Sequence, residues 1–117
     1  MDANAVGLQL IRVEQGELLA EITAACAQLG ISQGAVVSLI GAVDGFTVST
    51  MPADDPTKDV VTDYDLPAEM TGSGEIVDGV PHLHVVMAVE GDRAVAGHLH
   101  RARVGAWFAR VYVQALG

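Results

Sequence analysis

The spacing of apolar side chains predicts one helix near the start of the chain. In residues 17–29 they recur at helical spacing, with acidic residues in the early turns and Gly30 placed to end the helix. Before this helix, residues 6–13 follow a strand pattern that breaks at Gly16. After it, residues 35–40 form a β-branched run bounded by glycines, which is typical of a buried strand.

The remaining residues predict strands joined by turns. Strand patterns cover five further segments: 46–51, 70–77, 81–89, 93–101 and 105–115. Asp78-Gly79 is a hairpin turn signal, and the glycines of Gly72-Ser73-Gly74 predict a bulge or a close backbone approach. Residues 52–65 hold five aspartates without the ligand spacing of a calcium loop, so we expect a solvated, mobile loop.

One helix followed by many short strands indicates an α+β fold with a mainly antiparallel sheet. We expect a single domain over residues 1–117, with one main helix and additional short helices around the sheet. The lone cysteine, Cys26, lies in the apolar stripe of the helix and is expected in the core rather than as a nucleophile.

The charge balance disfavours a nucleic-acid surface, because 6 basic residues against 15 acidic ones give a net charge of −9. A local basic patch stays conceivable, since four of the six basic residues lie in the last quarter of the chain: Arg93, Arg101, Arg103 and Arg110. The longest nearly apolar run, 35–43, is too short to span a membrane, and the N-terminus lacks the features of a secretory signal. We therefore expect a cytoplasmic protein without a membrane partner.

All four histidines fall in two His-x-His pairs, His82-Leu83-His84 and His98-Leu99-His100. Residues two apart in a strand share a face, so each pair presents both imidazoles on one side. If the hairpin between the pairs is centred on Gly91, His84 lies opposite His98 and His82 opposite His100. A two-residue turn would instead send the second pair to the other face of the sheet.

Imidazoles converging in this way favour zinc, nickel, iron or copper over magnesium or calcium. Three histidines and a water would form an open site, whereas four would close it. The alternative is a set of ordinary strand histidines, but four crowded imidazoles would repel one another whenever protonated. Three carboxylates are candidates for a nearby acid or base: Glu75, Asp78 and Glu90.

The segment 74–84, GEIVDGVPHLH, with the later Gly97-His98-Leu99, resembles the signature of the plants-and-prokaryotes-conserved (PPC) domain. Segments 16–19, 30–34 and 40–43 are also similar to that family, so the resemblance covers nearly the whole chain. It implies an α+β homotrimer that binds a divalent metal, with zinc preferred and nickel or iron as alternatives. The implied ligands are His82, His84 and His98, while His100 is a candidate fourth ligand or a neighbour of the site.

Three functions stay open from the sequence. The first is a homotrimeric metal-binding protein with a regulatory role and an unknown small-molecule ligand. The second is a metal-dependent enzyme acting on an unknown small molecule, although a cupin is disfavoured because Glu90 lies too far from His84 and the second cupin motif is absent. The third is a DNA-associated regulator, as the family label suggests, although the chain lacks the AT-hook of plant relatives and carries residues 67–71, PAEMT, in place of their partnering motif. The chain also has Ala96 where the family usually has glycine, a small change that we expect the strand to tolerate.

Overall fold

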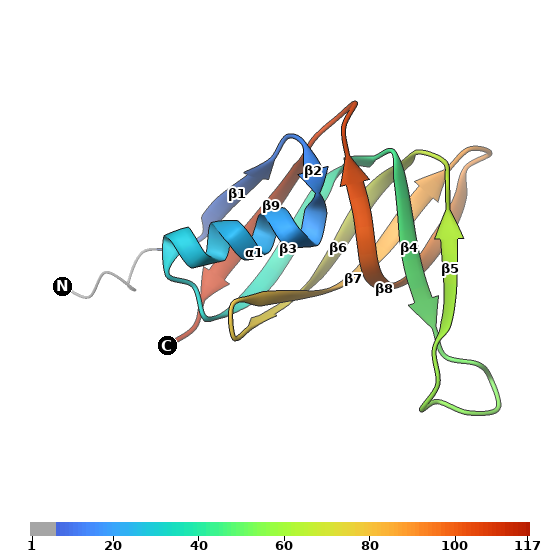
Figure 1. The fold of residues 1–117 in the computed structure, drawn as a ribbon, viewed down its shortest axis with the longest axis horizontal. Helices are drawn as coiled ribbons and strands as arrows, with labels where there is room; N and C mark the ends of the chain where they lie inside the picture. The colour runs from blue at the N-terminus through green and yellow to red at the C-terminus, as the bar shows by residue number, and fades with distance from the viewer. Residues whose placement is uncertain (1–6) are drawn as a thin grey trace.

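A long antiparallel sheet with one helix accounts for residues 7–117, the part of the chain that the computed structural model describes (Figure 1). The elements are β1 (Gln9–Val13), β2 (Gly16–Glu17), α1 (Leu18–Leu29), β3 (Gln33–Val43), β4 (Gly45–Thr50), β5 (Val60–Tyr64), β6 (Ala68–Val77), β7 (Val80–Val89), β8 (Arg93–Val104) and β9 (Ala109–Ala115).

The strand order of the sheet is β1-β9-β3-β6-β7-β8-β4-β5, and the short β2 pairs with β8 beside this path. Every pairing between strands is antiparallel. Figure 1 shows α1 lying across the end of the molecule that holds β1 and β9. Strands β7 and β8, which carry the histidines, therefore lie inside the sheet rather than at its edges.

The core lies between α1 and one face of the curved sheet. Leu18, Ile22 and Cys26 of α1 are completely buried, and α1 packs against β7 and β8. Strand β7 alternates strictly between buried and exposed residues, with Leu83 buried and His84 exposed. Burial also raises the pKa of the Cys26 thiol, as expected for a core cysteine.

Local interactions fix both ends of the predicted helix. The Glu17 carboxylate accepts hydrogen bonds from the backbone N–H groups of Leu19 and Ala20, which satisfies two free donors of the first turn. Gly30 ends the helix in the left-handed conformation, with a φ of 71°. No helix within residues 7–117 is long and apolar enough to cross a membrane.

The predictions of an antiparallel α+β fold and of its main helix are confirmed, but three details are wrong. The expected short helices do not occur among residues 7–117, where α1 is the one helix. The segment predicted as a loop over 52–65 contains strand β5, which pairs with β4 at the sheet edge. The last strand begins at Ala109 rather than at 105. Val6, where the first strand was expected to begin, lies outside the described residues.

Candidate metal centre

Two hairpins of different loop length bring the histidines together. The β6–β7 turn has two residues, Asp78 and Gly79, both with positive φ, as the sequence predicts. The β7–β8 loop has three residues, because Val89 pairs with Arg93. Its register places His84 directly opposite His98, as predicted for a hairpin centred on Gly91.

His82, His84 and His98 form one cluster on the exposed side of β7 and β8. Each offers a ring nitrogen, and these three nitrogens all lie within 4.8 Å of one another. The rings of His82 and His98 are closest, with centroids 4.7 Å apart, although these residues are not directly paired. His82 and His84 are exposed and His98 is partly buried, so the cluster is open to solvent.

His100 does not lie opposite His82, so that part of the predicted register is wrong. The β7–β8 pairing ends at His84 and His98, and β8 has an irregularity against β4 between Leu99 and Arg101. His100 is the extra residue of this β-bulge, and its ring still lies beside that of His98, with centroids 4.9 Å apart. A hydrogen bond of 2.8 Å joins His100 Nε2 to the hydroxyl of Ser49, a buried residue of β4.

The three-histidine cluster fits a tetrahedral metal ion. Two nitrogens that each lie about 2.0–2.1 Å from one zinc ion are about 3.3–3.4 Å apart in such a geometry. The three nitrogens lie within 4.8 Å of one another, so the rings must turn toward a common point to reach this spacing. Because His82 and His84 are exposed, their rings have room for this rotation.

The surroundings of His98 favour the neutral imidazole. Partial burial, followed by the neighbouring His82, His100 and His84, lowers the pKa of His98 below its ordinary value. Asp59, in the loop before β5, acts in the opposite direction and raises it. A lowered pKa keeps this imidazole neutral down to a lower pH, and the neutral form is the one that can coordinate a metal ion.

The three candidate carboxylates lie at different places along the β6–β7 hairpin. Glu75 pairs directly with His82, and its carboxylate lies 3.8 Å from His82 Nδ1. Asp78 is in the turn, where it accepts a hydrogen bond of 2.9 Å from Gln33 of β3. Glu90 lies in the β7–β8 loop, beyond the opposite end of β7. Among these three, the structure brings Glu75 to the histidines.

Glycines let the neighbouring strands approach the histidine backbone closely. A Cβ atom at Gly74 would lie 2.0 Å from the carbonyl oxygen of His82, and one at Gly72 would lie 2.4 Å from that of His84. The predicted close backbone approach is confirmed. A Cβ atom at Gly97 would likewise be too close to the carbonyl oxygen of Ser49. Ala96 is exposed, so its methyl group has room.

Sequence reasoning missed Ser49, the partner of His100. Nothing in the segment Phe46–Met51 distinguishes this serine from its polar neighbours, because its position depends on the pairing of β4 with β8. Pairing places Ser49 directly beside His98. Asp59, in the aspartate-rich segment, acts electrostatically on His98 and raises its pKa.

Residues 3–116 match the family model of the Plants and Prokaryotes Conserved (PCC) domain. The chain belongs to the PCC-domain family. This is the family that the histidine motifs resemble, under its other abbreviation, PPC. Comparison with curated proteins finds no match.

Solved structures share the fold of this PCC-domain chain. A metal-containing protein from Archaeoglobus fulgidus is 25% identical, with a TM-score of 0.75 over 94% of this chain and 81% of that one. A PPC protein from Pyrococcus horikoshii is 23% identical, with a TM-score of 0.71 over 94% and 79%. A putative DNA-binding protein from Bacteroides thetaiotaomicron is 20% identical, with a TM-score of 0.80 over 95% and 80%.

Proposed function

We propose that this PCC-domain protein binds one divalent transition-metal ion per chain through His82, His84 and His98. The observation that carries the proposal is the convergence of three imidazole nitrogens within 4.8 Å on one open sheet face. The metal-containing protein from Archaeoglobus fulgidus, which has the same fold, supports it. His100 stays outside the ligand set because its Nε2 is hydrogen-bonded to Ser49.

The donor set favours zinc, with nickel or iron as alternatives, because all three ligands are neutral imidazoles. A zinc ion held by three histidines keeps a coordination position for water or a small molecule and can act there as a Lewis acid. The exposure of His82 and His84 leaves that position accessible. A role as a regulatory protein with a small-molecule ligand at this position is the function that we favour.

Metal titration of chelator-treated protein tests the ligand set. We expect one zinc ion per chain by calorimetry, with retention by elemental analysis after gel filtration. His84→Ala should lower the affinity at least about 100-fold, because two imidazoles alone cannot complete the site. His100→Ala is the matched control, since it removes a histidine of the same face without removing a proposed ligand. Equal retention by His84→Ala and the unmodified protein would contradict the proposal.

We also propose that the chain assembles as a homotrimer, as its membership of the PCC-domain family implies. Several large apolar side chains are exposed in the single chain, among them Ile40 and Val86 in the middle of the sheet, and contact with other copies would cover such residues. Light scattering of the purified protein should give three times the chain mass of 12.2 kDa. A mass equal to one chain at micromolar concentration would contradict the trimer.

A metal-dependent enzyme is the second candidate, and the position of Glu75 favours it. The carboxylate of Glu75 lies 3.8 Å from His82 Nδ1 and is exposed, so it can exchange protons with a molecule beside the cluster. Screening the zinc-loaded protein against hydrolysable small molecules separates the candidates. An enzyme should show turnover that Glu75→Gln reduces while zinc affinity changes little. A binding protein should show none.

A further inference from the structure

A second cavity lies beside the loop that joins β8 to β9, which Figure 1 shows at the tip of β8. Its volume is about 370 Å³, within the range of small-molecule sites. None of the four histidines belongs to its lining, which includes Ile40, Ala42, Glu69, Trp107, Phe108 and Arg110. Strands β3, β6 and β9 therefore form its floor, and the loop forms one wall.

The strand register places the floor of this cavity on one side of the sheet. Ile40 of β3 pairs with Arg110 of β9, and Ala42 of β3 pairs with Glu69 of β6. Directly paired residues point to the same side, as do residues two apart in a strand. Ile40, Glu69 and Arg110 are all exposed, so this side faces away from the core. These side chains therefore open on the same space.

Backbone hydrogen bonds hold the β8–β9 loop, which carries Trp107. The carbonyl oxygen of Phe108 accepts a hydrogen bond of 3.0 Å from the N–H of Ala42, and the Asp44 carboxylate accepts one of 3.3 Å from the N–H of Ala106. Trp107 is nevertheless 65% exposed. The protein thus presents a large flat ring to solvent on an anchored loop, which favours contact with another flat apolar group.

Arg110 supplies the cation of the cavity. Its guanidinium carbon lies 4.4 Å from the centroid of the Phe108 ring, and such stacking positions the guanidinium while its N–H donors stay available. Within residues 7–117, Arg110 forms no ion pair with a carboxylate. Arg12 of β1 pairs directly with Arg110, so two like charges stand opposite each other. Like charges in this arrangement are destabilising, and a bound anion would relieve the repulsion.

Glu69 restricts the charge that the cavity accepts. It lines the side toward β6, and Ile40 and Ala42 of β3 separate it from Arg110. A second negative charge on a ligand would be repelled there. The cavity therefore favours one anionic group at Arg110 and an apolar body beside the Trp107 ring.

We infer that this cavity binds a small aromatic monocarboxylate. Arg110 would donate hydrogen bonds to the carboxylate, and the ring of the ligand would pack against Trp107 and Ala42. The cavity is separate from the histidine cluster, so this inference goes beyond the proposed metal site and does not depend on it.

Fluorescence titration of the chelator-treated protein with phenylacetate tests this inference. Trp107 is the only tryptophan of the chain, so its emission reports on this cavity alone. We expect a saturable change in emission. Benzyl alcohol, which lacks the charge, and acetate, which lacks the ring, should each bind at least about 10-fold more weakly. Equal affinity for either analogue would overturn the ligand class, and the absence of a saturable change would overturn the site.

Acrylamide quenching shows whether the cavity stays open in the assembled protein. Ile40 belongs to the apolar surface that we expect other copies to cover, so a neighbouring copy would close one side of the cavity. Trp107, on the loop at the end of β8, should stay accessible to acrylamide, and phenylacetate should protect it. A Trp107 that acrylamide does not quench without ligand would mean that another copy fills the cavity, and would overturn the inference.

Variants then assign the contacts. Arg110→Gln should lower the affinity for phenylacetate at least about 10-fold, whereas Glu69→Gln should bind it at least as tightly as the unmodified protein. Arg101→Gln, which changes an exposed arginine outside the cavity lining, should leave the affinity unchanged. Unchanged affinity in Arg110→Gln would contradict the carboxylate contact. His84→Ala should bind phenylacetate normally, so failure of the metal site and failure of this cavity give different results.

Discussion

The environment of His98 couples the protonation of one side chain to the stability of the fold. Partial burial and three neighbouring histidines lower its pKa in the folded chain, while the unfolded chain has the ordinary value of about 6.5. Between these two values the unfolded chain binds more protons, so stability increases with pH. The contribution of His98 to the free energy of unfolding is fully present at a pH above its pKa in the unfolded chain. It is lost as the pH falls through its pKa in the folded chain.

The titration of His98 follows from this environment. In the metal-free protein, NMR should show the His98 ring titrating below the ordinary histidine range. Urea denaturation should show the free energy of unfolding decreasing as the pH falls below about 6.5. His98→Gln should reduce this pH dependence because it removes the group that titrates. A His98 pKa at or above the ordinary value would contradict the described environment.

Strands and turns decide how much of the site can be predicted from sequence. The spacing of the two His-x-His pairs about Gly91 correctly predicts that His84 faces His98, because the register of a hairpin follows from its loop. The place of His100 in the sheet could not be predicted in the same way. It depends on a bulge that arises where β8 pairs with β4, and β4 is distant in the sequence. Strand β5 was missed because most of its residues are exposed, which removes the alternation that identifies a strand.

The backbones of the paired strands β6 and β7 approach each other closely at Gly74, so we expect this glycine to be required for the site. Gly74→Ala places a methyl group against the His82 carbonyl, so the strands must separate beside a proposed ligand. We expect the free energy of unfolding to decrease by about 1–3 kcal/mol, together with weaker zinc binding. Urea denaturation and zinc calorimetry measure both effects.

Gly7→Ala is the control for this substitution, because a Cβ atom at Gly7 meets nothing within 4 Å. It should change neither the stability nor the zinc affinity appreciably. Unchanged stability in Gly74→Ala would mean that the approach of the two strands is looser than the structure describes.

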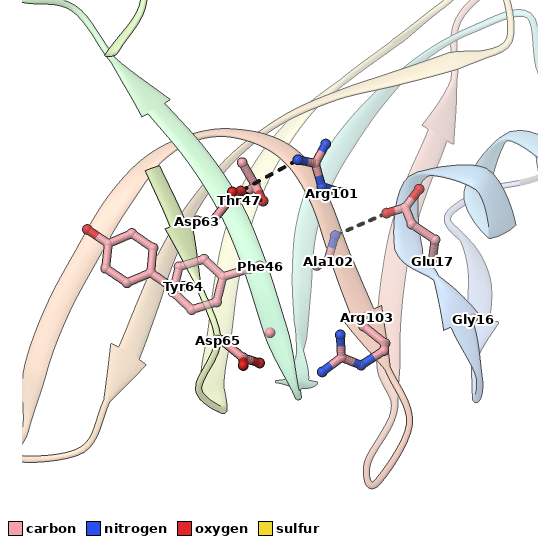
Figure 2. A pocket seen from close by; sticks show the side chains of 11 residues that line it. Gly16, Glu17, Phe46, Thr47, Asp63, Tyr64, Asp65, Arg101, Ala102 and Arg103 are labelled. Carbon is pink, nitrogen blue, oxygen red and sulfur yellow. Dashed lines mark hydrogen bonds and ion pairs between the residues drawn. The ribbon is translucent and has the colours of Figure 1, made fainter. Parts of the chain in front are cut away.

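Within residues 7–117, the arginines of the last quarter of the chain do not gather into one basic surface. Arg101 pairs with Asp63, and Arg103 lies across strand β4 from Asp65 (Figure 2). Arg110 lies over the Phe108 ring, 4.4 Å from its centroid, and Arg93 is beside the β7–β8 loop. The basic residues of the last quarter of the chain are therefore dispersed or balanced by acidic neighbours, which is unfavourable for binding a polyanion.

This distribution predicts that the protein does not bind duplex DNA directly, in contrast to the description of the relative from Bacteroides thetaiotaomicron. Fluorescence anisotropy with a labelled duplex should show no binding even at low salt, where phosphate contacts are strongest. Saturable binding that weakens steeply with added salt would contradict this prediction. It would indicate that the assembled protein forms a basic surface that the single chain lacks.

The central claim is that three histidines of the β7–β8 hairpin hold a metal ion. Its most direct test is a crystal structure of the zinc-loaded protein, with anomalous scattering measured at the zinc absorption edge. We predict one anomalous peak per chain, coordinated by His82, His84 and His98, with His100 still hydrogen-bonded to Ser49. A peak at other residues, or no peak at this cluster, would contradict the claim.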